Sequence, residues 1–221
     1  MKRSGRMETQ VKQTESLTRS AFLLAFDLRK EKLTQRSELG YLLRAAALAE
    51  LLLAGNLADE SGKARALTHP AAEPGSLRAV VWEQISNSPP RSWRRWVQKD
   101  LGKAVRVVRD ELAAARMINV ERRHILLFPV ERITPRKAYL SRRLAERVGR
   151  AIRGGQPVGH LDEDVRVLAA LAAAIRLKTV IPSWRETRLR RDRIQQLSAP
   201  VEPIATALRK SVEAARAAAS G

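Results

Sequence analysis

The stretch SELGYLLRAAALAELLLAGNL, residues 37–57, decides the fold class of this chain. Its leucines recur with the spacing of one face of an α-helix. The leucines of this predicted buried stripe are Leu39, Leu42, Leu43, Leu48, Leu51 and Leu52. Ser37 is the predicted N-cap, and Gly55 stands where glycine commonly ends a helix. The stretch therefore predicts one long helix with a buried face.

Composition extends the helical prediction to the rest of the chain. The chain has 221 residues, of which 44% are hydrophobic but only 4% are aromatic. Strands favour aromatic and β-branched residues, so this composition favours packed helices in one domain. We expect this domain to cover residues 15–200, after a polar, disordered segment over 1–14 and before a weakly anchored Ala/Arg-rich tail over 201–221.

Most of the remaining segments also predict helices, with one exception. The exception is NVERRHILLFPVERITP (119–135), where a short apolar run between polar residues predicts a β-hairpin or a single strand. Pro135 is predicted at the first position of the helix that follows. The nearly apolar segment 165–180 should be central, with acids 162–164 at its start. The predicted helices cover 76–86, 91–99, 101–117, 135–153, 165–180 and a basic segment that ends near 197.

The chemistry-bearing residues form no catalytic or metal-binding constellation. The chain has no cysteine, and its histidines, His69, His124 and His160, lie far apart in sequence without a carboxylate at metal-ligand spacing. The glycines at 154–155 neither follow a strand nor precede a Lys-Ser/Thr pair, so they do not form a phosphate loop. We therefore expect no enzyme, no cofactor and no metal site.

Positive charge is the property that this chain has in excess. Lys and Arg number 42 and Asp and Glu number 23, so the formal net charge is +19. A charge of this size points to a polyanionic partner, either an anionic membrane or a nucleic acid. The chain contains no apolar run of transmembrane length and no signal peptide, so we expect a cytoplasmic protein.

Two groups of cations stand out along the chain. Lys103, Arg106 and Arg109 recur every three residues on one side of the helix predicted over 101–117. Arg44 lies at the edge of the apolar stripe of the helix at 37–57, where a guanidinium needs an anion. That anion is either a carboxylate of a neighbouring helix or a bound phosphate, and the pattern leaves both open.

The order of several segments is similar to that of a known family. The segments are GYLLRAAALAELLLAGNL (40–57), VRVVRDEL (105–112), the run 125–128 with its following proline, VRVLAALAAAI (165–175) and LRRDRIQQL (189–197). In this order and spacing the chain resembles the Golgi phosphoprotein 3 family from Leu17 to Leu197. Its Ala- and Arg-rich composition suggests a bacterial member of that family.

The resemblance implies a single, mainly α-helical domain with a central helical bundle and a flanking β-hairpin. It implies that the hairpin helps to dock the protein to membrane and to other copies of the chain. It also implies binding of phosphatidylinositol 4-phosphate, and an adaptor role that holds membrane proteins by their cytosolic tails. The family's headgroup arginine falls on Arg44, and its Arg-x-x-Arg pair falls on Arg106 and Arg109, with Lys103 as the candidate in the gapless register. The headgroup-stacking tryptophan of the family is replaced by Gln35.

Two functions of different classes follow. The first is a peripheral membrane protein on the cytoplasmic face of a membrane, where Arg44, Arg106 and Arg109 bind an anionic phospholipid headgroup. The second is a winged-helix-like DNA-binding protein, since a basic helix followed by a β-hairpin suits such a module. The second is disfavoured because the basic helix carries no Asn or Gln to read bases. A structural scaffold is a third alternative.

Overall fold

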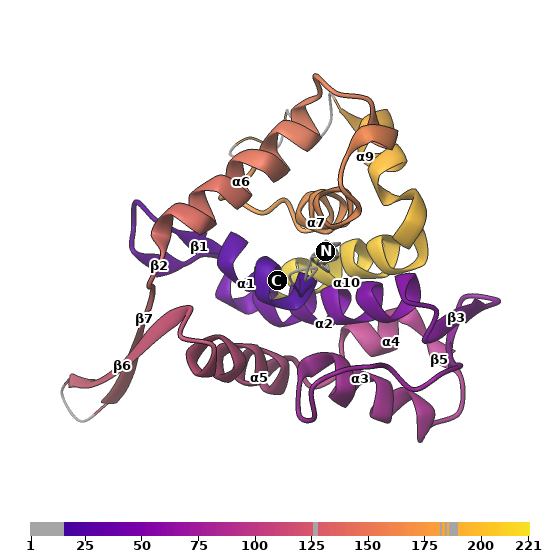
Figure 1. Ribbon diagram of the computed structural model, residues 1–221, viewed down its shortest axis with the longest axis horizontal. Helices are drawn as coiled ribbons and strands as arrows, with labels where there is room; N and C mark the ends of the chain where they lie inside the picture. Colours follow the sequence, from indigo (N-terminus) through magenta and orange to yellow (C-terminus); the bar gives the residue numbers. More distant parts are fainter. Residues whose placement is uncertain (1–15, 126–127, 182, 184, 186–189) are drawn as a thin grey trace, which may run out of the picture.

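The structure is a computed structural model that describes residues 16–125, 128–181, 183, 185 and 190–221, so the segment 1–14 lies outside the described residues. The described chain is mainly α-helical, which confirms the predicted fold class, and its helices form three layers (Figure 1). The middle layer contains α1 (Leu17–Leu24), α2 (Arg36–Leu53) and α10 (Glu202–Ser220).

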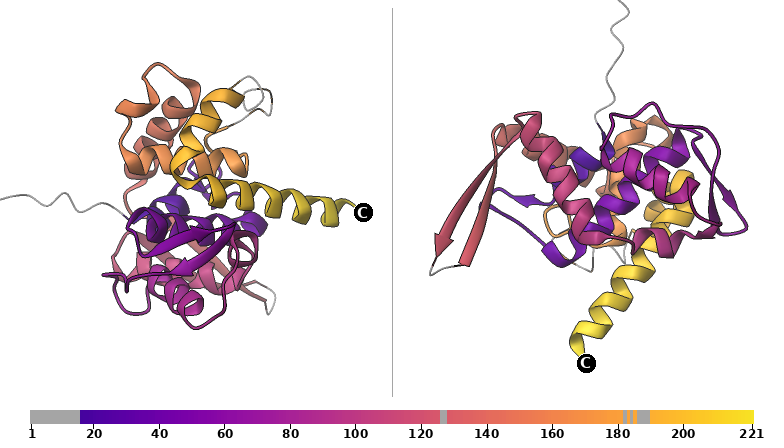
Figure 2. Two further views of the ribbon diagram at one scale, coloured as in Figure 1. Left: turned by 90° about the vertical axis from the view of Figure 1, so that its right-hand side faces the viewer. Right: turned by 90° about the horizontal axis from the view of Figure 1, so that it is seen from below.

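The two outer layers lie on opposite sides of α2 and α10, as Figure 1 and the left view of Figure 2 show. One layer contains α6 (Ala138–Arg153), α7 (Glu163–Ala174), α9 (Arg191–Ser198) and the short 3-10 helix η1 (Val158–His160). The other layer contains α3 (Leu77–Ser86), α4 (Trp93–Val97) and α5 (Leu101–Ala114). A second 3-10 helix, η2 (Ala199–Val201), leads into α10.

Three small antiparallel sheets also occur among the described residues. The strands are β1 (Phe26–Asp27) with β2 (Lys32–Leu33), β3 (Leu57–Glu60) with β4 (Lys63–Ala66) and β5 (Arg91–Ser92), and β6 (Ile118–Ile125) with β7 (Phe128–Pro135). The β6–β7 hairpin confirms the strand prediction for 119–135, and it projects from the body between α5 and α6 (Figures 1 and 2). Pro135 ends β7 rather than beginning α6, because it pairs with Ile118 in the ladder.

Helix α2 is the predicted central helix, with different ends. Its buried face includes Leu42 and Leu48, and Gly55 ends it with a positive φ of 70°. The N-cap is Gln35 in the left-handed conformation and not Ser37, which lies inside the first turn. Gly40 lets α2 approach α5 closely, because a Cβ at this position would lie 2.7 Å from the Cβ of Leu101.

The C-terminal segment differs most from its prediction. We expected residues 201–221 to be a weakly anchored tail, but they form η2's end and α10, in the middle layer. The buried residues of α10 are Ile204, Ala205, Ala207, Leu208, Ser211 and Val212. The apolar residues at helical spacing in this segment therefore indicated its burial, whereas its Ala-rich composition did not. The end of α10 projects from the body (Figure 2).

Helix α7 is buried, as predicted, but shorter than expected. Residues Val167 to Ala173 are at most 3% exposed, whereas the helix ends at Ala174 and not at 180. Glu163 and Asp164 lie in its first turn, where acidic side chains favour the helix dipole. Among the described residues, no helix combines the length and apolarity needed to cross a bilayer.

Candidate functional site

Arg44 is fully buried, with only 1% of its surface exposed. Its Nε donates to the backbone oxygen of Trp96 (2.9 Å), and its Nη1 donates to Oε1 of Gln84 (2.9 Å). Its Nη2 is buried, and none of the described residues accepts a hydrogen bond from it. Neither of the two alternatives for Arg44 describes this arrangement directly, because both acceptors are neutral oxygens of α3 and α4.

A carboxylate lies one residue further along this chain of contacts. Nε2 of Gln84 donates to Oδ2 of Asp100 (2.9 Å), the N-cap residue of α5. Burial lowers the pKa of the Arg44 guanidinium to about 10, and the negative charge of Asp100 opposes that shift. Arg44 is therefore still a cation at neutral pH, with the Asp100 carboxylate close enough to stabilise its charge.

The first turn of α5 is open to solvent. Gly102 and Lys103 are exposed, and the Asp100 side chain makes no capping hydrogen bond. Within the described residues, the backbone N–H groups of residues 101–103 have no protein acceptor. Unpaired N–H groups at a helix start, together with the helix dipole, attract anions such as phosphate. The Asp100 carboxylate contacts Gln84 and Lys99 (3.6 Å) and makes no described hydrogen bond to these N–H groups.

The predicted cations of α5 fall into two environments. Lys103 and Arg106 are exposed, and no ion pair involves them in the part of the chain that the structure describes. Arg109 is only 14% exposed and pairs with Asp110 (2.8 Å) and with Glu131 of β7 (2.6 Å). Burial acts to lower the pKa of Arg109, but the hydrogen bonds to these two carboxylates raise it overall. The structure thus brings Arg109 to the hairpin, and no described contact joins it to Arg44.

Gln35, at the position where the resemblance led us to expect a tryptophan, ties two helices together. Its Nε2 donates to the backbone oxygen of Ile175 (3.2 Å), and its Oε1 accepts from the backbone N–H of Lys178 (2.8 Å). Its neighbour Glu38 accepts two hydrogen bonds of 2.8 Å from Arg216 of α10. The hydrogen bonds of Glu38 raise the pKa of Arg216. Gln35 therefore anchors the start of α2 to the end of α7.

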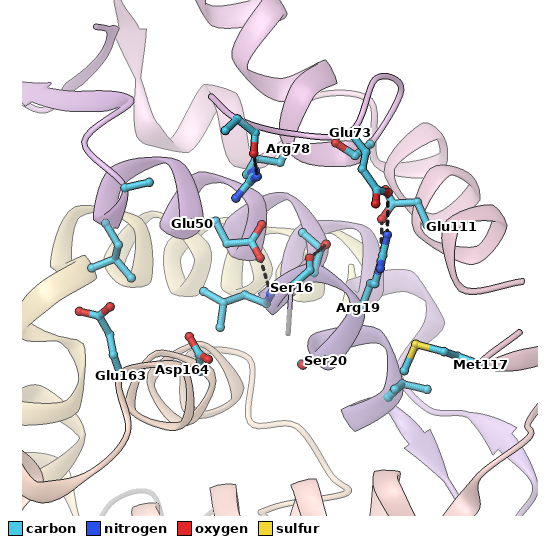
Figure 3. A pocket seen from close by; sticks show the side chains of 17 residues that line it. Ser16, Arg19, Ser20, Glu50, Glu73, Arg78, Glu111, Met117, Glu163 and Asp164 are labelled. Carbon is cyan, nitrogen blue, oxygen red and sulfur yellow. Dashed lines mark hydrogen bonds and ion pairs between the residues drawn. The ribbon is translucent and has the colours of Figure 1, made fainter. Parts of the chain in front are cut away.

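A separate pocket of about 730 Å³ lies among α1, the end of α2 and the start of α3 (Figure 3). None of Arg44, Lys103, Arg106 and Arg109 lines it. Most of its charged side chains are acidic, and several of these acids make hydrogen bonds that support the fold. Glu50 accepts from the backbone N–H of Leu17, and Glu111 accepts from that of Leu77 (2.8 Å) and from Arg19 (3.3 Å).

These carboxylates cap the first turns of α1 and α3, which explains their presence in a basic protein. Burial raises the pKa of Glu50, while its hydrogen bond from Leu17 opposes the shift.

His69 and His160 lie in different surroundings. The His69 ring packs edge-on against Trp82 at 4.5 Å, and His160 is exposed in η1. The side chain of His124 lies outside the description. No group of three or more potential metal ligands occurs among the described residues.

The contacts of Gln84 and Trp96 with Arg44 had no counterpart in the sequence predictions. Trp96 contributes a backbone oxygen, so its side-chain identity carries no signal for this role. Asp100 lies directly before the predicted helix 101–117. Its position could therefore have identified it as the N-cap residue next to the site.

Comparison with known proteins adds a family match to this geometry. The family model described as Golgi phosphoprotein 3 (GPP34) matches residues 17–215, and so includes most of α10. A search of curated proteins found no match.

Proposed function

The chain belongs to the Golgi phosphoprotein 3 family, and from this premise we propose that it is a peripheral membrane protein that binds anionic phospholipid headgroups. We place the headgroup phosphate at the first turn of α5. The protein acts in this proposal as a non-catalytic binding module on the cytoplasmic face of a membrane. The adaptor role toward cytosolic tails of membrane proteins, and self-association, remain predictions from the family.

The open first turn of α5 is the observation that carries this proposal. It combines unpaired backbone N–H groups with the exposed cations Lys103 and Arg106. Gly102 leaves room for a ligand, because a Cβ there would meet no atom within 4 Å. Backbone donors and flexible cations at one helix start suit a phosphate monoester.

The predicted arginines take different roles in this proposal. Lys103 and Arg106 contact the phosphate directly. Arg44 supports the site indirectly. It donates hydrogen bonds to the backbone oxygen of Trp96 and to Gln84, and Gln84 in turn binds Asp100, the residue directly before the N–H groups. Arg109 holds the base of the hairpin through Glu131 instead of reaching the phosphate.

DNA binding fits these contacts less well. The exposed side of α5 carries Lys103 and Arg106 but no Asn or Gln that would read a base edge. The hairpin that follows α5 is held to it through Arg109. The arrangement suits one phosphate at a helix start more than a duplex groove.

Titration with a soluble headgroup tests the proposal. We expect glycerophosphoinositol 4-phosphate to bind the wild type, and the variant Lys103→Gln/Arg106→Gln to bind at least roughly tenfold more weakly, since each lost charge-assisted hydrogen bond is worth about 1.5–3 kcal/mol. The matched control Arg94→Gln/Arg95→Gln removes two exposed cations of α4 and should bind as the wild type does. Equal losses in both variants would contradict a site at α5.

A further inference from the structure

The outward side of α6 is strongly cationic, and we propose that it is a second membrane-contact surface, which binds anionic bilayers through charge without headgroup selectivity. Its exposed arginines are Arg142, Arg143, Arg150 and Arg153. We call these residues, together with Tyr139, the α6 basic face. This surface is separate from the first turn of α5, and it rests on the proposed function only for the kind of partner, a membrane.

The fold does not need the α6 basic face. Val148, Ala151 and Ile152 are at most 2% exposed, and this opposite side of α6 packs on α7 and α1. The hydrophobic side of the helix is thus already covered within the domain. The arginines point away from that contact, so their packing contribution to the core is small.

The charges of this face are also largely unbalanced. Glu146 is the one acidic residue within α6. Of the exposed arginines, Arg147 pairs with Asp162 (2.6 Å), whereas Arg142, Arg143 and Arg150 make no ion pair with any described residue. Arg150 and Arg153 repel each other at spacing i, i+3, whereas Glu146, four residues from both Arg142 and Arg150, offsets part of the charge of this face.

Several features of α6 favour a bilayer as the anion. Tyr139 is 55% exposed within the basic face, and tyrosine is amphipathic and enriched at membrane interfaces. A helix of 16 residues is about 24 Å long, which allows its cations to contact many lipids when it lies flat. The face carries no Asn or Gln for base contacts.

Vesicle pelleting with the full chain tests the inference. The variant Arg142→Gln/Arg143→Gln/Arg150→Gln is compared with the matched control Lys63→Gln/Arg94→Gln/Arg95→Gln, whose cations are equally exposed but lie in the β4–α4 region, in another layer. Vesicles of phosphatidylcholine with phosphatidylglycerol provide charge alone. Vesicles with phosphatidylinositol 4-phosphate, at equal total charge, add the specific headgroup. Thermal melting confirms that each variant is folded.

We expect the α6 variant to bind phosphatidylglycerol vesicles roughly a hundredfold more weakly than the wild type, because each cation near an anionic surface contributes about a fivefold change. The control should lose much less. Any remaining preference for the phosphoinositide should be unchanged in the α6 variant.

The other outcomes separate this inference from the proposed function. If the wild type shows no headgroup preference but the α6 variant loses binding, the headgroup site is wrong and the α6 face stands. If the α6 variant and the control lose binding equally, or neither does, the α6 face is overturned while a headgroup preference can persist. A larger loss on duplex DNA than on vesicles would make the face a nucleic-acid surface and would also overturn it. A wild type that binds no vesicle contradicts both.

Discussion

Helices α5 and α6 flank the same hairpin, and both carry rows of cations, but they hold them differently. On α5, Arg109 forms ion pairs with Asp110 and Glu131. Lys103 and Arg106 make no described ion pair, and they accompany the unpaired N–H groups of the open first turn. On α6, the cations spread over one side of the whole helix, and only Arg147 has a described carboxylate partner. A compact set of donors can select one phosphate, whereas a broad charged face senses only charge density.

This difference shows that helical spacing in the sequence identifies cations on one side of a helix. It does not indicate which of these cations are free to bind a ligand. Lys103, Arg106 and Arg109 are regularly spaced along one helix. Arg109 nevertheless pairs with Glu131, which lies 22 positions further along the chain. Availability depends on the tertiary ion pairs, which compete directly with a ligand for the same guanidinium.

Arg44→Ala should give the largest effect, because it removes the buried support of the α5 site. We expect a loss of about 3 kcal/mol in the free energy of unfolding, measured by urea denaturation, since the change leaves Gln84 and the Trp96 oxygen without their partner and opens a cavity.

The exposed Arg143→Ala provides the control on α6 and should change stability by less than about 0.5 kcal/mol. If Arg44→Ala were as stable as the wild type, Arg44 would not support the fold. Its role would then lie entirely with a ligand.

Gly40→Ala should come next, because it pushes α2 and α5 apart. The new methyl group would lie 2.8 Å from the backbone oxygen of Leu101 and 3.0 Å from its Cα, so a helix must shift. We expect a cost of about 2 kcal/mol and a weaker response to soluble headgroup, with α6-dependent vesicle binding unchanged. Gly102→Ala, where no atom is near, is the control for stability. Equal stability of the two variants would contradict the close approach.

The helices and the hairpin were predictable because each is a local pattern. Apolar spacing located α2, α3, α5 and α7, and the change of period located β6 and β7. The burial of α10 was missed, because alanine is compatible both with a solvated helix and with a tightly packed one. The N-cap of α2 was missed because Gln35 gains its position from Ile175 and Lys178, which are remote in sequence.

The site was predictable only in part. Sequence identified Arg44 as a cation at the edge of an apolar stripe, whereas the structure buries it fully. Its acceptors are a glutamine and a backbone oxygen, so neither a charge pattern nor a residue type pointed to them. Arg109 forms an ion pair with Glu131 of β7, and the spacing of cations along one helix does not reveal such a tertiary contact.

Asp100→Asn should strengthen headgroup binding at α5 and leave the cations of α6 unaffected. The change removes a negative charge beside the proposed phosphate, and asparagine tolerates the left-handed conformation of this residue, whose φ is 50°. We expect roughly fivefold tighter binding of the soluble headgroup, from about 1 kcal/mol of removed repulsion. Binding to phosphatidylglycerol vesicles should change little. Unchanged headgroup binding in titration would place the phosphate away from the start of α5.

Glu50→Gln should give the smallest effect and report on the acidic pocket. Burial raises the pKa of Glu50 in the folded state, so the folded protein binds this proton more tightly than the unfolded chain does. The wild type should therefore gain stability at this residue as the pH falls from 7 toward 5, whereas the variant should not.

At pH 7 the variant should be equally stable or more stable by less than about 1 kcal/mol, because the glutamine oxygen still accepts from Leu17. Denaturation at several pH values measures the difference between the two proteins. A wild type that loses stability relative to the variant as the pH falls would contradict the raised pKa.

The central claim is that α5 selects a headgroup while α6 supplies nonselective attraction, and one vesicle series tests it most directly. The measured quantity is the ratio of binding to phosphatidylinositol 4-phosphate vesicles over phosphatidylglycerol vesicles of equal charge. The account predicts that Lys103→Gln/Arg106→Gln brings this ratio to about one with binding retained. It predicts that Arg142→Gln/Arg143→Gln/Arg150→Gln weakens binding to both vesicles and leaves the ratio unchanged. The same ratio and the same loss in both variants would contradict the division between the two helices.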